Sequence, residues 1–255
     1  CITSRVSSAG PVNICTPFFS EVDTFQGCTV AISANRNIII GRKLRVETTT
    51  AGLWSPPKID WTSETLNRGL NVLDKLCIDS IPESGLSGTV WPFPKHRRLP
   101  AECHVAMPFI RSLSAWLESS LMSDSARSLP TDSRALLGLG PGLTPSGDDF
   151  LIGMLISLAT IDRFDLLSVL SDAIEPFLAQ RTGPISRLHI KAALNGEANE
   201  QLHLMLNFVL GGHIHQIRSQ LDVISNIGHS SGWDSLAGVI PVSYTHLTLP
   251  TNREV

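Results

Sequence analysis

The spacing of apolar residues divides the chain into two parts of different character. Up to about residue 57, short β-branched runs are separated by glycine, proline and asparagine, a pattern typical of strands joined by turns. From residue 63 onward, apolar residues recur every three or four positions, as they do on one face of a helix. The sequence therefore predicts an α+β fold, with a small β-rich part at 1–57 followed by a mostly helical body at 58–240. The β-branched runs are 12–15, 28–32 and 37–40.

The helical body has one segment that is apolar on nearly every side, at residues 150–159. Such a segment predicts a central, buried helix. The other predicted helices are amphipathic, and several end at glycines, which commonly follow the last helical turn. Residues 82–101 carry several prolines and glycines and are expected to form a long loop. The amphipathic stripes begin at Leu66, Met107, Phe164, Leu188, Leu202 and Ile214.

A glycine-rich loop leads directly into the central helix. Residues 138–149 read Gly-Leu-Gly-Pro-Gly-Leu-Thr-Pro-Ser-Gly-Asp-Asp. Such a loop offers N–H groups and the positive end of a helix dipole, which favour an anion. Asp148 and Asp149 would repel a bare anion. They are expected either to hold a divalent cation such as Mg²⁺ or to accept protons from an amide or amine substrate. No metal ligands are assigned.

The start of this helix is repeated near the end of the chain. Residues 146–153 align without gaps to 231–238, with Ser, Gly, Asp, Leu and Gly shared. Both copies fit the capping-box pattern, with Asp149 and Asp234 at its last position. We expect the two helix starts to lie close together, with each of these carboxylates bonded to N–H groups of its own first turn. The alternative is that both motifs are helix caps without chemistry.

These two motifs supply the candidate site residues. Asp148 is the strongest candidate for chemistry, because the capping box already uses Asp149. The predicted catalytic residues are Asp148, Asp149, His229 and Asp234. The predicted substrate-binding residues are Gly138, Gly140, Gly142, Thr144, Ser146, Gly147, Ser230 and Ser231.

Several other classes of protein are disfavoured. Residues 228–232 fit the pattern G-x-S-x-G, but they follow a helical stripe rather than the strand that a serine hydrolase requires. A net charge of −3 gives no basic footprint for nucleic acid or anionic lipid. The longest apolar run is too short to span a membrane. Five cysteines without CxxC spacing favour free thiols in the cytoplasm.

Residues 242–255 resemble a translated sequencing adapter. The string Val-Ser-Tyr-Thr-His-Leu-Thr-Leu-Pro-Thr is what a transposon mosaic end and its adjoining adapter encode in frame. We therefore expect 241–255 to be a non-native tail without a packing role, with Pro241 ambiguous. The natural C-terminus would then be missing, and the absence of an initiator Met suggests an incomplete N-terminus as well. A natural Thr-rich strand is the alternative.

The two motifs together resemble the AllH-like family. They are Gly-Leu-Thr-Pro-Ser-Gly-Asp-Asp at 142–149 and Gly-His-Ser-Ser-Gly-Trp-Asp-Ser-Leu-Ala-Gly at 228–238. Residues 182–186 and 192–196 are similar to that family too, and the likeness is strongest from 136 onward. The family includes the small third subunit of oxamate carbamoyltransferase. Ordinary aspartate-type carbamoyltransferases carry a Ser-Thr-x-Arg-Thr phosphate loop, which this sequence lacks.

The resemblance implies a subunit of a multi-subunit enzyme of anaerobic allantoin and purine breakdown. That enzyme interconverts oxalurate plus phosphate with oxamate plus carbamoyl phosphate. The implied partners are two larger subunits and these small anionic substrates, with neither nucleic acid nor membrane. Three functions stay open: a catalytic or co-catalytic subunit, a noncatalytic assembly or ligand-sensing subunit, and a metal-dependent amide or phosphate hydrolase.

Overall fold

The computed structural model describes residues 2–4, 9–11, 13–16, 29–33, 37–41, 44–122 and 128–248. Its contacts divide the chain into two compact units, Cys1–Ser55 and Pro56–Val255. The first unit carries the strands and the second the helices, so the α+β prediction is confirmed. Among the described residues, no helix combines the length and apolar character needed to cross a membrane.

The N-terminal unit contains short strands of three residues each. β1 (Ile2–Ser4) pairs in parallel with β2 (Ile14–Thr16). β3 (Val30–Ile32), β4 (Ile38–Ile40) and β5 (Leu44–Val46) form an antiparallel meander in that order. Three of these strands overlap the predicted β-branched runs, whereas β1 and β5 lie outside them. The buried Cys77 and Cys103 are free thiols, while Cys1 and Cys28 lie outside the described residues.

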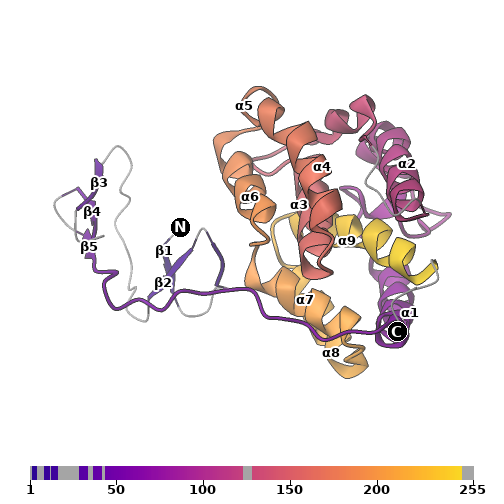
Figure 1. Ribbon diagram of the computed structural model, residues 1–255, viewed down its shortest axis with the longest axis horizontal. Coiled ribbons are helices and arrows are strands. Elements are labelled where there is room, and N and C mark those ends of the chain that lie inside the picture. The colour runs from indigo at the N-terminus through magenta and orange to yellow at the C-terminus, as the bar shows by residue number, and fades with distance from the viewer. Residues whose placement is uncertain are drawn as a thin grey trace. The chain divides into compact units, whose positions relative to one another are not determined.

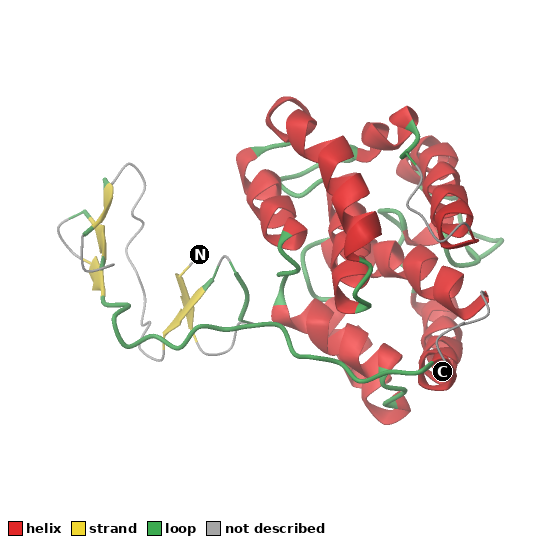
Figure 2. Cartoon of the chain, viewed as in Figure 1, coloured by secondary structure: helices red, strands yellow, loops and turns green. Residues whose placement is uncertain are grey.

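The second unit is helical throughout, with short 3₁₀ turns in its connections (Figure 2). The predicted loop at 82–101 contains one such turn, η1 (Ser87–Thr89). The helices are α1 (Ser63–Ser80), α2 (Ala101–Met122), α3 (Ser146–Thr160), α4 (Phe164–Ile174), α5 (Leu178–Arg181), α6 (Pro184–Leu194), α7 (Glu200–Leu210), α8 (Ile214–Ile224) and α9 (Ser231–Thr248). The remaining 3₁₀ turns are η2 (Thr131–Leu136) and η3 (Glu175–Phe177).

Helix α3 lies at the centre of this unit, with α4, α6 and α9 packed against it (Figure 1). Every residue from Ser146 to Leu158 is buried, as the continuous apolar pattern predicts. Helix α9 makes the most extensive contact with α3. A Cβ on Gly153 would lie 1.9 Å from the Ser235 carbonyl oxygen, and one on Gly238 would lie 1.9 Å from that of Phe150. The two helix backbones therefore touch at a pair of glycines in equivalent positions of the repeat.

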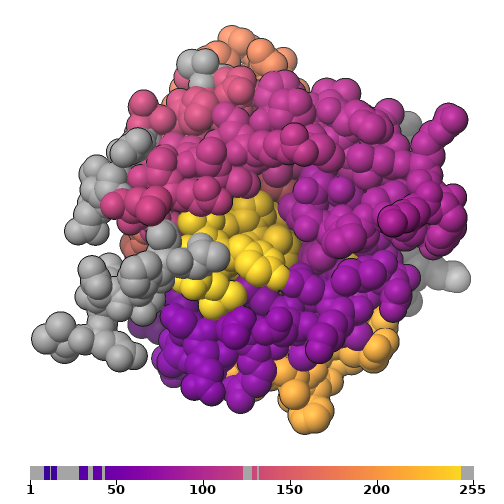
Figure 3. Space-filling view, turned by 90° about the vertical axis from the view of Figure 1, so that its right-hand side faces the viewer, coloured from indigo at the N-terminus to yellow at the C-terminus, as the bar shows by residue number. Residues whose placement is uncertain are grey.

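Helix α9 continues into the segment that resembles an adapter. It also packs against α1 and α2, and part of it is visible between them in Figure 3. Val242 is fully buried, and Ser243 and Thr245 are also buried. The expectation that this tail has no packing role is wrong for residues 242–247, because Val242, Thr245 and Leu247 extend the buried side of α9. The origin of the segment stays a prediction, and 249–255 lie outside the described residues.

Because α3 and α9 touch at glycines, adding one methyl group at this contact should destabilise the folded protein. Gly238→Ala should lower the free energy of unfolding by about 1–3 kcal/mol, because overpacking forces the helices apart. A Cβ added at Gly52 would meet nothing within 4 Å, so Gly52→Ala serves as the matched control with little expected effect. Urea unfolding followed by tryptophan fluorescence measures both. Equal stability of the two variants would show that the helices do not touch at Gly238.

Candidate functional site

The starts of α3 and α9 have the same local structure. The Gly147 N–H donates to the Leu139 carbonyl at 2.8 Å, and the Gly232 N–H donates to the Ile227 carbonyl at 3.1 Å. Both glycines also sit where a Cβ would collide with the carbonyl of the last residue of the preceding helical element, Leu136 of η2 or Ile224 of α8. The sequence repeat is therefore a structural repeat, and the two copies face each other across the crossing of α3 and α9.

Hydroxyl groups link the two helix starts reciprocally. The Thr144 and Ser231 hydroxyl oxygens are 2.9 Å apart. The Ser231 hydroxyl, at the start of α9, lies beside Asp149 of α3 and favours its charged form. The Ser146 hydroxyl, at the start of α3, lies beside Asp234 of α9 and favours its charged form. The prediction that the two starts lie close together, with Asp149 and Asp234 in equivalent positions, is confirmed.

The predicted capping box at the start of α3 is wrong. Ser146 is the first residue of α3, Pro145 precedes it at the N-cap, and no side chain caps this end. The first-turn N–H groups bond instead to backbone carbonyls of the loop, with Gly147 N–H bonded to Leu139 and Asp149 N–H to Pro145. The carboxylates are therefore free to bond away from their own helix.

Asp148 has a structural environment. It is fully buried, and its Oδ1 accepts the Gly138 N–H at 2.7 Å. Its Oδ2 accepts the Ser186 hydroxyl at 2.7 Å and also the Thr182 hydroxyl. A Cβ on Gly138 would lie 2.0 Å from a carbonyl oxygen, so this glycine permits a close approach of backbone. Asp148 thus ties the glycine loop to the start of α6 and has both oxygens occupied.

Asp234 is enclosed by the long loop before α2. It is fully buried, and its Oδ1 accepts the Leu86 N–H at 2.6 Å. Gly85, with φ +79°, lets the loop come this close, because a Cβ there would lie 2.3 Å from Oδ1. Burial raises the pKa of Asp234 to about 6, while the hydrogen bond from Leu86 opposes the shift.

Asp149 is the carboxylate that reaches a cavity. Only 5% of the residue is exposed, and its buried Oδ2 has no hydrogen-bond partner. Burial raises the pKa of Asp149 to about 8; the Ser231 hydroxyl opposes this shift, and the negative charges of Asp234 and Asp148 add to it. Near neutral pH, Asp149 is therefore poised to gain or lose a proton.

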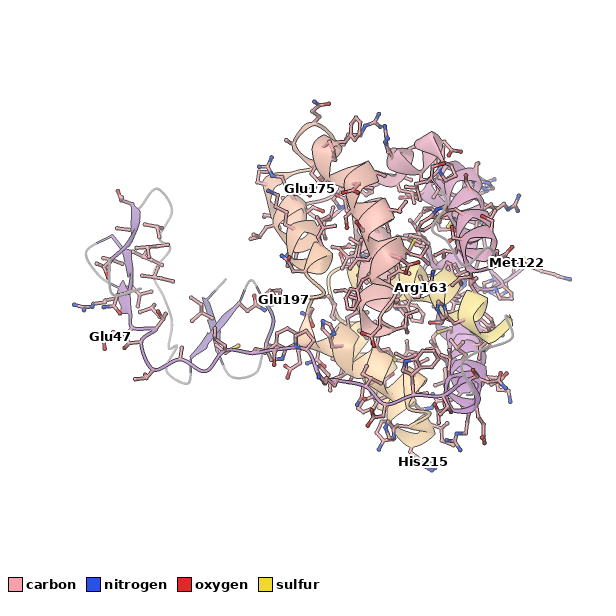
Figure 4. The ribbon with its side chains drawn as sticks, in the orientation of Figure 1. Glu47, Met122, Arg163, Glu175, Glu197 and His215 are labelled. Carbon is pink, nitrogen blue, oxygen red and sulfur yellow. The ribbon has the colours of Figure 1, made fainter. Side chains whose placement is uncertain are left out.

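The cavity has a volume of about 220 Å³ and lies between α3, α6, α7 and α9. Its walls combine apolar side chains with a few polar groups, and neither Lys nor Arg lines it. Glu197, labelled in Figure 4, marks the connection from α6 to α7, where Ala198 and Asn199 line the wall. The lining residues are Thr144, Asp149, Ile152, His189, Ala198, Asn199, Leu202, Ile224, Ile227, Gly228, Ser231, Gly232 and Ser235.

The structure separates the sequence-predicted site residues into two groups. Thr144, Asp149 and Ser231 line the cavity. The others lie outside its lining: Asp148, Asp234, Ser146, Gly147 and Ser230 around the helix starts, Gly138, Gly140 and Gly142 in the loop, and His229, which is exposed. The nucleophile-elbow pattern at 228–232 follows α8, not a strand, which agrees with its rejection.

Sequence reasoning missed three polar lining residues. His189 lies on α6, and burial lowers its pKa. Asn199 caps α7, where its side chain accepts the Gln201 N–H at 2.8 Å. Ser235 lies on α9. The capping position of Asn199 was a readable signal, whereas His189 and Ser235 belong to no motif.

The described residues offer no ligand set for a divalent cation. Among them, no three His, Cys, Asp or Glu side chains are grouped so that they could share a metal ion. Both oxygens of Asp148 are occupied by protein donors. The residues present therefore do not fit the Mg²⁺ site considered for Asp148 and Asp149.

Comparison with known proteins identifies the region that carries the cavity. A family model described as oxamate carbamoyltransferase subunit AllH matches residues 136–242. Over these residues the chain is similar to that family. This match confirms the resemblance carried by the two motifs, and it spans every lining residue of the cavity. No curated protein and no solved structure matches the chain.

Replacing Asp148 or Asp149 by asparagine should affect the free energy of unfolding to very different extents. Asp148→Asn should lower the free energy of unfolding by about 1.5–3 kcal/mol, because an amide group cannot accept all three donors around it. Asp149→Asn should cost little, because it breaks no backbone hydrogen bond. Urea unfolding at several pH values measures both variants.

The raised pKa of Asp149 also predicts a pH dependence. A carboxyl group whose folded pKa is about 8, against an ordinary 3.8, stabilises the fold below pH 4 and loses that stabilisation as pH rises toward 8. The wild type should therefore lose stability relative to Asp149→Asn over this interval. Asp234 titrates in both proteins, so their difference reports Asp149 together with its electrostatic coupling to Asp234. Parallel stability curves from pH 4 to 8 would contradict the assignment.

Proposed function

We propose that this chain is a subunit of a cytoplasmic carbamoyltransferase of the oxamate type, and that the cavity beside Asp149 binds part of the substrate. The observation that carries the proposal is that the AllH match contains all the lining residues of the cavity. The family description supplies the enzyme, and the geometry supplies a buried carboxyl group at a small cavity.

The proposed reaction transfers a carbamoyl group between oxalurate and phosphate. A phosphate oxygen bonds to the carbamoyl carbon of oxalurate, the bond from that carbon to the amide nitrogen breaks, and the nitrogen takes up a proton. The products are carbamoyl phosphate and oxamate. In reverse, the oxamate nitrogen attacks the carbamoyl carbon of carbamoyl phosphate and gives up a proton.

Asp149 suits the proton transfer of this reaction. With a pKa of about 8, it holds a proton at neutral pH and can donate it to the departing nitrogen. In reverse, its carboxylate accepts the proton from the attacking nitrogen. His189 lies in the same cavity, and its lowered pKa keeps it neutral, so it can donate or accept a hydrogen bond without adding charge.

The composition of the cavity supports a shared active site. A phosphate dianion and its transition state require cations or preorganised N–H donors. Neither Lys nor Arg lines this cavity. We propose that two larger partner subunits supply the phosphate-binding groups, and that this chain holds the nitrogen end of the substrate.

Reconstitution of the complex tests this function. Asp149→Asn should lower turnover by the roughly 10²–10⁴-fold typical of general acid–base groups. In the oxalurate-cleaving direction, kcat/KM of the wild type should fall as pH rises past about 8, since the free protein then lacks the proton donor. The exposed Asp172 on α4 provides the matched control, because Asp172→Asn makes the same chemical change away from the cavity.

Two outcomes would decide against this role. Full turnover of Asp149→Asn in an assembled complex would remove the carboxyl group from the chemistry and favour a ligand-sensing subunit. Carbamoyl transfer by the partner subunits without this chain, at the rate of the whole complex, would overturn a catalytic contribution altogether.

A further inference from the structure

The internal repeat allows the surroundings of Asp149 and Asp234 to be compared position by position. Each carboxylate has beside it one hydroxyl from the loop before its own helix and one from the start of the other helix. The hydroxyls are those of Thr144 and Ser231 at Asp149, and those of Ser230 and Ser146 at Asp234. The helix-start hydroxyls of Ser146 and Ser231 hold equivalent positions in the repeat, whereas the loop hydroxyls of Thr144 and Ser230 are one position apart.

One backbone hydrogen-bond donor distinguishes the surroundings of Asp234 from those of Asp149. At Asp234 the fully buried Leu86 places its N–H 2.6 Å from Oδ1. No backbone N–H of the described residues takes this place at Asp149, where the cavity of about 220 Å³ opens instead.

Asp149 itself lines this cavity, so its carboxyl group lies within reach of a ligand there. Both carboxylates are buried and leave Oδ2 without a partner, but Asp234 does not line the cavity. Buried acceptors without a partner are costly, so a ligand donor beside one is favoured. Of the two equivalent positions, only Asp149 offers such a place.

We infer that the amide N–H of a small ligand occupies, at Asp149, the place that the Leu86 N–H occupies at Asp234. A backbone amide is a planar N–H donor next to a carbonyl group. The ligand class that reproduces it is a small amide, carbamoyl or ureido compound. The inference rests on the proposed function and deepens it by naming the group that meets Asp149.

The walls of the cavity agree with such a ligand. Apolar side chains such as Ile152, Leu202 and Ile224 can pack against a flat group, while Thr144, Asn199 and Ser231 provide hydrogen-bonding atoms around its edge. Without Lys or Arg in the lining, nothing favours placing an anionic end there. The neutral amide end of a substrate is therefore the end that fits.

Ligand binding should be coupled to proton release. An N–H donor stabilises the charged form of Asp149, so binding lowers the pKa of a group that starts near 8. The titratable groups facing Asp149 are Asp148 on its own helix, Asp234 on α9 and His189 on α6. His189 is already neutral and Asp148 already fully hydrogen-bonded, so the released proton comes from Asp149.

The test compares ethyl oxamate with ethyl pyruvate on the full chain. The two esters are neutral and nearly identical in shape, and differ by an NH₂ group in place of a CH₃ group. Wild-type protein should bind ethyl oxamate roughly tenfold more tightly, because ethyl pyruvate leaves the buried carboxyl group unpaired. Ligand-detected NMR titration measures both affinities. The affinity for ethyl oxamate alone should rise from pH 6 to pH 8.

Two variants keep the test decisive. Asp149→Leu has a side chain of similar size without an acceptor and should lose the preference. Asp149→Asn, which retains an acceptor oxygen, should keep part of it if Asp149→Leu does not fold. Asp172→Asn should behave as the wild type. Equal binding of the two esters, or a preference that survives Asp149→Leu, would overturn the inference.

The failure of this inference can be told apart from failure of the proposed function. Binding is measured on this chain alone, without partner subunits or phosphate. An amide preference that depends on Asp149, together with an Asp149-independent rate of carbamoyl transfer, would leave the binding site standing and remove its catalytic role. A rate of carbamoyl transfer that depends on Asp149, without an amide preference in binding, would keep the catalytic role and remove the amide contact.

Discussion

The close crossing of α3 and α9 is the constraint on which the rest of this structure depends. Glycines at equivalent positions let the two backbones touch, and any larger residue would separate them. This contact brings the two helix starts together although 85 residues separate Ser146 from Ser231 in the sequence. The reciprocal placement of serine hydroxyls beside aspartates then follows from the geometry of the crossing.

The crossing buries three carboxylates within a short distance, and their neighbours give each a different role. Asp148 is saturated by one N–H and two hydroxyls, which fixes the glycine loop. Asp234 receives the Leu86 N–H and is sealed by the loop before α2. Asp149 alone among the three lines the cavity, and burial holds its pKa far above the ordinary value. Of the three acidic residues, Asp149 is therefore the one placed to meet a ligand in the cavity.

Much of the fold and part of the site could be predicted from the sequence. The continuous apolar run of α3 indicated burial, and the repeat at 146–153 and 231–238 indicated two equivalent helix starts, because both signals are local. The roles of Asp148 and Asp149 were not readable in the same way. They depend on Gly138, Thr182 and Ser186, which reach Asp148 from other segments. His189 enters the cavity from α6 without any motif.

The protonation of Asp149 underlies both the proposed chemistry and the proposed ligand, since each depends on a buried carboxyl group that exchanges a proton near neutral pH. It can be measured by an NMR titration of the ¹³C-labelled aspartate carboxyl groups in the full chain, with Asp149→Asn to assign the signal. We expect a pKa of about 8 for Asp149. A pKa near the ordinary 3.8 would contradict this expectation, because it would mean that the carboxylate is solvated and that the crossing of α3 and α9 does not bury it.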